Sequence, residues 1–170
     1  MFFRTACLIV AVAFVSAGDP VEDSTNALKL KAFRPGDADY SGESLTVRCS
    51  FNVNKTTFVS LTKLKMYASD VVGGSDFETL GSLTQDKFSY GLTRKEISVG
   101  GKYQTNIDRR SKLEITWVSP TSGYCKIYQC VATGRDPNNG KLLGIYKNFQ
   151  VDAADGSSCT ASISASIKLL

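Results

Sequence analysis

Two short segments constrain the fold of this 170-residue chain most strongly, because each alternates apolar residues and carries a cysteine on its apolar side. Successive side chains of a strand point to opposite faces, so alternate residues share one face. Residues 45–51 place four residues on one face: Leu45, Val47, Cys49 and Phe51. Residues 122–132 do the same with Tyr124, Tyr128, Cys130 and Ala132. The sequence therefore predicts two strands whose cysteines face the interior and form a Cys49–Cys130 disulfide. Closing this loop would remove about 4.5 kcal/mol of entropy from the denatured state and so stabilise the fold.

The rest of the chain continues as short strands between turn residues. We predict strands over residues 27–33, 58–67, 77–83, 94–99, 112–118 and 141–151. The apolar residues change from one face to the other between Leu61 and Leu64, which predicts a bulge. Residues 77–83 are expected to form a strand at a sheet edge. Gly100-Gly101 are expected to turn the chain. The last strand is expected to bury Leu143, Ile145, Phe149 and Val151. Since no stretch of helical length shows a helical apolar period, the pattern favours an all-β antiparallel sandwich.

The N-terminus resembles a targeting segment. A short basic start ending at Arg4 is followed by the uncharged residues 5–15 and by small residues up to Gly18. This predicts a secretory signal peptide over residues 1–18 and a secreted, extracellular product, with a retained signal anchor as the alternative. We divide the remainder into a domain at 27–151, preceded by a loose polar leader, and a flexible serine-rich tail at 152–170.

Two further cysteines lie outside the predicted core. Cys125 is an odd number of residues from Cys130, so it faces outward in a regular strand. Its expected partner is Cys159 in the tail, and the alternative is that either cysteine joins a second chain. The sequence has no histidine and no C-x-x-C pair, so we expect neither a metal site nor a cofactor.

The distribution of charge argues against nucleic acid as a partner. The formal net charge is +4, and the basic residues are scattered, with small clusters at Arg94-Lys95 and Arg109-Arg110. Such clusters are too thin for a nucleic-acid footprint. A weak preference for anionic surfaces, such as sulfated or acidic glycans, is left open.

Three motifs resemble a known family. Residues 45–51 (LTVRCSF), residues 113–117 (LEITW) and the Y-x-C motif at Tyr128 to Cys130 resemble strands B, E and F of an immunoglobulin variable-type domain. Residues 113–136 are similar to the immunoglobulin domains of molluscan fibrinogen-related proteins, which are secreted haemolymph lectins. The resemblance implies an immunoglobulin-like Greek-key sandwich in which the Tyr128 hydroxyl bonds back to the corner backbone.

The chain departs from that family in three respects. Residues 58–67 lack the tryptophan usual against the core disulfide, so Trp117, or Leu61 with Leu64, is expected to fill that space. Tyr124 and Lys126 stand where the family usually has an acidic and a small residue. No fibrinogen-like domain follows, so carbohydrate binding through such a domain is not implied.

Function is expected to be binding rather than catalysis. Without histidine there is no serine or cysteine nucleophile with a histidine base, and the predicted disulfides consume the thiols. Loops at the ends of a sandwich usually carry recognition, and three are expected to cluster at one end: the loop at 52–57, the turn at 70–75 and a hairpin at 135–140. The candidate binding residues in them are Asn52, Lys55, Asp70, Ser75, Arg135, Asp136, Asn138 and Asn139.

The expected partner is a protein or glycan on a cell or microbial surface, recognised in innate immunity. The alternative is cell adhesion or extracellular assembly, including a disulfide-linked or non-covalent homodimer. Asn54-Lys55-Thr56 is a sequon, so Asn54 is a predicted glycosylation site in a turn.

Overall fold

The computed structural model describes residues 20–39, 41, 44–56, 58–69, 76–85, 87–90, 97–104, 111–117 and 126–151. Its elements in chain order are the strands β1 (Val21–Glu22), β2 (Leu28–Phe33) and β3 (Thr46–Phe51), the 3-10 turn η1 (Val53–Lys55), and the strands β4 (Ser60–Ser69), β5 (Glu78–Thr84), β6 (Phe88–Tyr90), β7 (Ile97–Lys102), β8 (Ser111–Trp117), β9 (Lys126–Arg135) and β10 (Leu142–Val151). The predicted all-β class is confirmed for these residues.

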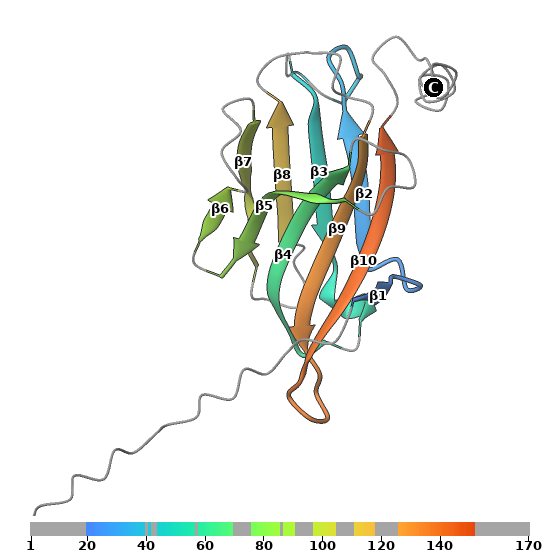
Figure 1. Cartoon of the computed structure of the whole chain (residues 1–170), viewed down its shortest axis with the longest axis vertical. Coiled ribbons are helices and arrows are strands. Elements are labelled where there is room, and N and C mark those ends of the chain that lie inside the picture. Colours follow the sequence, from blue (N-terminus) through green and yellow to red (C-terminus); the bar gives the residue numbers. More distant parts are fainter. Residues whose placement is uncertain are drawn as a thin grey trace, which may run out of the picture.

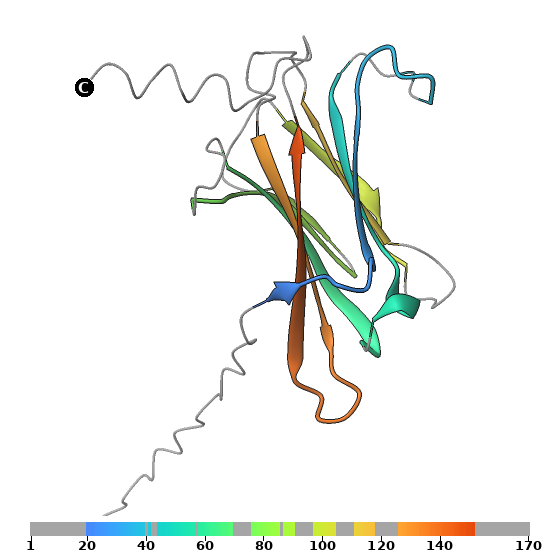
Figure 2. The same ribbon diagram turned by 90° about the vertical axis from the view of Figure 1, so that its right-hand side faces the viewer.

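The strands form two sheets that lie face to face (Figures 1 and 2). One sheet has six strands in the order β1-β10-β9-β4-β5-β6, and the other has four strands in the order β2-β3-β8-β7. All pairs are antiparallel except β1 with β10, so the larger sheet is mixed and the smaller one is antiparallel.

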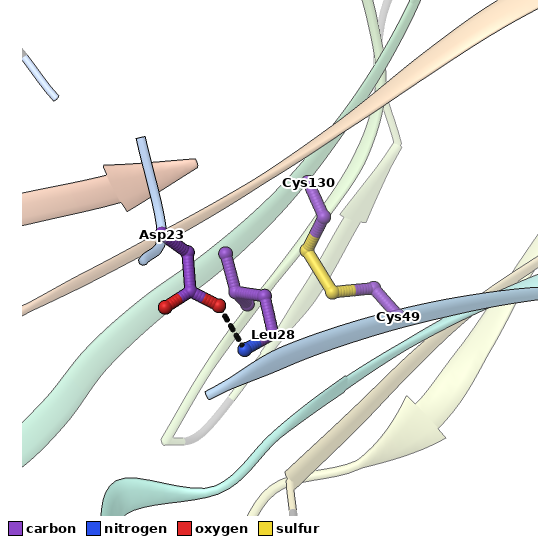
Figure 3. The surroundings of a disulfide bond; sticks show 4 residues. All are labelled: Asp23, Leu28, Cys49 and Cys130. Carbon is purple, nitrogen blue, oxygen red and sulfur yellow. Dashed lines mark hydrogen bonds between the residues drawn. A yellow bond between two sulfur atoms is a disulfide. The ribbon is translucent and has the colours of Figure 1, made fainter. Parts of the chain in front are cut away.

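The Cys49–Cys130 disulfide joins the two sheets through the core, with the Cα atoms 6.2 Å apart (Figure 3). Cys49 lies on β3 and Cys130 on β9, and both side chains are fully buried. The predicted inward residues of both strands are also buried: Leu45, Val47, Phe51, Tyr128 and Ala132. Leu113, Ile115 and Trp117 of β8 complete the same core, as their alternation predicts. The apolar period of two therefore identified the interior faces of three central strands.

A bulge in β4 confirms the change of phase predicted near Leu61. The pairing of β4 with β9 shifts register between Leu61 and Lys63, so both Leu61 and Leu64 reach the core. The carbonyl of Leu61 accepts a hydrogen bond from the hydroxyl of Tyr103, which follows β7 in the other sheet. This contact ties the irregular start of β4 to the opposite sheet.

Three local expectations are wrong. Residues 77–83 do not form an edge, because β5 lies between β4 and β6. Gly100 and Gly101 do not turn the chain but continue β7, where a Cβ on Gly101, at φ 141°, would lie 2.1 Å from the Lys112 carbonyl oxygen. Leu143 is 36% exposed, since it lies close to the hairpin, beyond the covered part of β10.

The segment before β2 is not a loose leader but part of the sheet. β1 pairs in parallel with β10, and the Asp23 amide donates to the Tyr146 carbonyl at 2.8 Å. The Asp23 carboxylate then accepts a hydrogen bond from the Leu28 amide at 2.8 Å (Figure 3). It also accepts from the amide and hydroxyl of Thr25 at 3.0 and 2.8 Å. Burial acts to raise the pKa of Asp23, but these bonds outweigh it and hold the pKa below its ordinary value of 3.8.

A polar cluster occupies the core beside β8 and β9. The indole Nε1 of Trp117 donates to the Tyr128 hydroxyl at 2.9 Å, and both side chains are buried. Lys126 faces the same interior, with its ammonium 5.6 Å from the centre of the Trp117 ring, and burial lowers the pKa of this lysine. The expected bond from Tyr128 to the corner backbone involves residues 118–125, which lie outside the described residues.

Met66, and not Trp117, lies directly beside Cys130 on the neighbouring strand β4. Leu64, two residues away on the same strand, is fully buried and pairs with Ala132. The space near the disulfide is therefore lined by a flexible thioether and a leucine, and Trp117 approaches from the other sheet. No helix in the described ranges is long and apolar enough to cross a bilayer.

Candidate functional site

The hairpin between β9 and β10 is the best-defined candidate loop. The Asp136 amide donates to the Lys141 carbonyl and the Gly140 amide to the Asp136 carbonyl, each at 2.9 Å. Gly140 has φ 68°, in the left-handed region that glycine adopts readily. The predicted hairpin at 135–140 is therefore confirmed.

Most polar side chains of this hairpin stabilise the turn itself. The Asp136 carboxylate accepts from the Asn138 amide at 2.9 Å, and the Asn139 side-chain oxygen accepts from the Lys141 amide at 2.8 Å. The guanidinium of Arg135 donates to the Gly140 carbonyl at 3.4 Å. Such contacts are the usual reason for aspartate and asparagine in turns. Three of the four candidate residues here therefore have a structural role.

The second candidate loop follows β3 and contains η1. The Asn52 side-chain oxygen accepts from the Asn54 amide, and its carbonyl accepts from the Lys55 amide, both at 3.2 Å. Asn52 therefore holds the turn together, while Asn54 and Lys55 are exposed. The sequon thus lies in a turn, as predicted.

These two loops lie side by side at one end of the sandwich, at the bottom of Figure 1. The Val59 amide donates to the Arg135 carbonyl at 3.0 Å, and Ser60 pairs with Arg135. Phe58 packs over Gly134, where a Cβ would lie 2.3 Å from the phenylalanine ring. Phe58 also stacks on Phe51 with ring centres 6.0 Å apart. The two loops therefore share one packed base.

Lys55, Val59 and Asn138 are among the side chains at this end that are directed to solvent. Val59 is 63% exposed despite being apolar. Lys55 and Asn138 are exposed, and within the described part of the chain their side chains make no hydrogen bond or ion pair. The sequence identified Lys55 and Asn138 but missed Val59, because a single valine before a strand carries no signal of its exposure.

The strand end that leads to the third expected loop is not at this end of the sandwich. Asp70 and Ser75 lie outside the described residues, but β4 leads into that loop at Ser69, which pairs with Ile127 near the start of β9. The candidate hairpin follows the other end of β9, at Arg135. A strand of ten residues spans roughly 30 Å, so Ser69 and Arg135 lie at opposite ends of the sandwich.

A shorter turn between β5 and β6 approaches the loop end instead. The Thr84 amide donates to the Lys87 carbonyl at 2.9 Å. Lys63 of β4 pairs with Thr84 on one side and with Thr133 of β9, close to the hairpin, on the other. Lys87 is exposed and Phe88 is 44% exposed. The sequence missed this turn because the three residues of β6 are too few to show alternation. Beside it, burial, and secondarily the charge of Lys65, lowers the pKa of Lys63.

A hollow of about 250 Å³ lies at the far end, between the edge strand β2 and the last residues of β10. Its lining combines apolar and polar residues: Ala32, Arg34, Asp37, Phe149, Gln150 and Val151. The Asp37 carboxylate accepts from the Arg34 amide at 2.7 Å, so this acid stabilises its own turn. Within the described ranges, no group of three or more cysteine, aspartate or glutamate side chains is placed to share a metal ion.

Several predicted positions lie outside the described residues: residues 1–18, the tail at 152–170, Cys125 and Cys159. The alternatives for these cysteines therefore stay open. No protein-family model matches the chain, and no curated protein matches it either.

Proposed function

We propose that the protein is an immunoglobulin-type sandwich of the variable kind that acts by binding rather than by catalysis. The order of strands carries the proposal. Variable-type domains place strands A, B, E and D in one sheet and G, F, C, C′ and C″ in the other. The orders β2-β3-β8-β7 and β10-β9-β4-β5-β6 correspond to these two sets, with the disulfide between the B and F equivalents.

Two features distinguish this chain from that pattern. β1 pairs with β10 before the chain crosses to β2, so the first strand joins the larger sheet. Met66 takes the position beside Cys130 in the strand that corresponds to C. Neither feature alters the order of the strands that follow, so both are compatible with the proposed architecture.

The proposed function is recognition of foreign glycan or protein surfaces by a secreted protein in innate immunity. Two adjacent loops on a rigid, disulfide-linked base support it, because recognition commonly lies on loops held by such a scaffold. Lys55 and Asn138 offer hydrogen-bond donors, and Val59 offers an apolar contact at the same end. The resemblance of residues 113–136 to molluscan haemolymph domains supports the immune role, and the exposed Asn54 suits glycosylation in export.

Adhesion or extracellular assembly is the second candidate, favoured by the outer face of the larger sheet. Tyr67, Ile127 and Tyr146 point outward there and are half-buried. An aromatic and apolar face of this kind suits contact with another protein. A link through Cys159 would make such an assembly covalent.

The two functions are separated by a pair of matched variants. K55A/N138A removes one charge and one amide from the loop end, and K65A/N148A removes the same groups from the outer face of the larger sheet. We expect the full-length protein secreted by cultured cells to bind bacterial and yeast cells or a glycan array, and K55A/N138A to lose at least ten-fold in affinity (about 1.4 kcal/mol). Loss of binding or dimerisation in K65A/N148A alone would refute loop recognition in favour of assembly.

A further inference from the structure

The outer face of the four-stranded sheet collects basic residues that are scattered in the sequence. Inward residues of this sheet alternate with outward ones, and the outward positions include five cations: Lys29, Lys31, Arg48, Lys102 and Lys112. We call these five residues the basic face. It spans all four strands, because Lys29 lies on the edge strand β2 and Lys102 on the edge strand β7.

The register sets the basic face out as two rows. Lys29 pairs with Ser50, Ser50 with Lys112, and Lys112 with Lys102, so one row crosses three strand spacings, roughly 14 Å. Lys31 and Arg48 pair in the next row, about 7 Å along the strands. Two like-charge pairs therefore stand directly opposite each other, an arrangement that destabilises a sheet.

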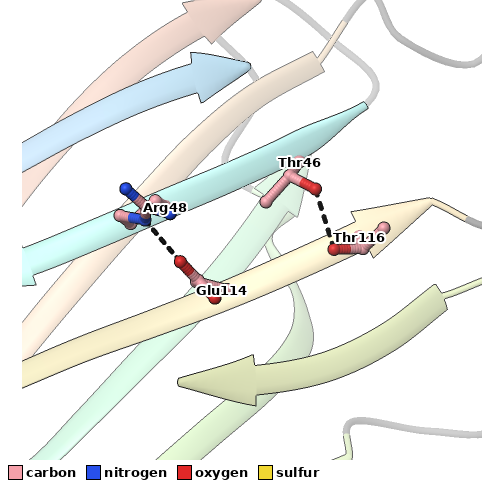
Figure 4. Close-up of polar contacts among 4 residues, drawn as sticks. All are labelled: Thr46, Arg48, Glu114 and Thr116. Atoms are coloured by element: carbon pink, nitrogen blue, oxygen red, sulfur yellow. Dashed lines mark hydrogen bonds and ion pairs between the residues drawn. The ribbon is translucent and has the colours of Figure 1, made fainter. Parts of the chain in front are cut away.

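Carboxylates compensate only part of this charge. The Arg48 guanidinium pairs with Glu114, as Figure 4 shows. Lys31 lies 3.6 Å from Asp39, and both of these side chains are more than half exposed, so that pair is weak. Lys29, Lys102 and Lys112 are exposed, and no carboxylate in the described ranges lies within ion-pair distance of them.

The surroundings of the basic face are polar and flat. The hydroxyls of Thr46 and Thr116 bond to each other at 2.8 Å in the row beyond Arg48 (Figure 4). Phe33 is the aromatic residue among the outward positions of this sheet, and it is only 6% exposed because Lys31 and Arg48 cover its ring at 4.8 and 4.4 Å. Gly100, opposite Glu114 on the edge strand β7, leaves open space at that side of the face.

We propose that the basic face binds a sulfated linear polysaccharide. Lysines are compact point charges suited to separate sulfate groups, and Ser50, which lies between Lys29 and Lys112 in one row, offers a hydroxyl to a sugar. Single-stranded nucleic acids require exposed aromatic rings for stacking, and this face presents Phe33 only beneath its cations. Peripheral membrane binding draws on inserted apolar side chains, which the described outward positions here do not offer. The surface is separate from the loop end and does not depend on the function proposed for the loops.

The test uses the full-length secreted protein and heparin as the probe, with affinity measured by biolayer interferometry at several salt concentrations. K29Q/K112Q removes two exposed charges of the basic face, and K87Q/K141Q removes two exposed charges elsewhere. We expect K29Q/K112Q to weaken binding about 25-fold, about five-fold for each lysine, with a shallower salt dependence. K87Q/K141Q should change affinity less than two-fold, and de-sulfated heparin should not compete.

A third variant tests for a gain of affinity, which misfolding cannot produce. G100K adds a cation where the structure leaves open space, so affinity should rise about five-fold. The proposal is overturned if wild-type protein does not bind heparin, if both double variants weaken binding equally, or if G100K binds no more tightly. Tighter binding to duplex DNA or to phosphatidylserine vesicles than to heparin would also overturn it in favour of those polyanions.

Discussion

The disulfide between Cys49 and Cys130 should supply a large share of the stability of the domain. The two cysteines are separated by 81 residues, and closing a loop of that length removes about 4.5 kcal/mol of denatured-state entropy. A domain of this size is typically stable by about 5–15 kcal/mol. We therefore expect the reduced protein to be marginally folded at 25 °C.

Urea unfolding measures this contribution most directly in the variant C7S/C125S/C159S, where Cys49 and Cys130 are the only cysteines. Trp117 is the single tryptophan and is buried, so its fluorescence reports the transition. Reduction should lower the free energy of unfolding by about 4–5 kcal/mol and should steepen the urea dependence, because the reduced denatured chain is more expanded.

A loss below about 1 kcal/mol would refute this reasoning. It would mean that the denatured chain already holds β3 and β9 close together, so the bridge constrains little that is not constrained already.

Three further predictions concern local contacts. Y128F removes the acceptor of the buried Trp117 indole and should cost about 1–3 kcal/mol in thermal unfolding, whereas a change within error would contradict a buried hydrogen bond. G134A places a Cβ against the Phe58 ring and should cost about 1–3 kcal/mol through overpacking, with G100A, where a Cβ meets no atom within 4 Å, as a comparison of the glycine change alone. D23N should cost about 1 kcal/mol or less at neutral pH, since the carboxylate is partly exposed. Because the pKa of Asp23 in the folded protein lies below 3.8, wild type should be more stable than D23N above pH 3.8. This difference in stability should vanish as the pH falls through the folded pKa. A stability difference that does not depend on pH would contradict the assignment.

The central strands could be predicted because burial on one face imposes a period of two. Val47, Cys49, Leu113 and Ile115 alternate with polar residues, so inward faces and the disulfide followed from the sequence alone. The bulge near Leu61 was predictable for the same reason, since a bulge is the simplest way to keep apolar residues inward across a change of phase.

Positions set by long-range pairing could not be predicted in this way. β1 and β6 have too few residues to show a period, so only their partners in the sheet define them. Gly100 and Gly101 have the composition of a turn, yet β8 pairs with both and extends them as strand.

The candidate site was predictable only in part. Turn composition located the hairpin and the η1 loop, but it could not separate Asn138 from Asn139, whose side chain completes the turn. Nor could it separate the two ends of the sandwich, because that requires the direction of β4. The basic face was hidden for a related reason: its cations are remote in sequence and meet only through the register of four strands.

The disulfide also determines how far the molecule can lengthen under tension. A pull on the two ends of the chain passes through the sulfur–sulfur bond, so the 81-residue loop between the cysteines carries no load. At about 3.4 Å per residue, this withholds roughly 275 Å of chain from extension. Of the strands, only β1, β2, β3 up to Cys49, β9 after Cys130 and β10 can be drawn out while the disulfide is intact. A tethered molecule therefore extends by a short length, and reduction of the disulfide makes that extension much longer.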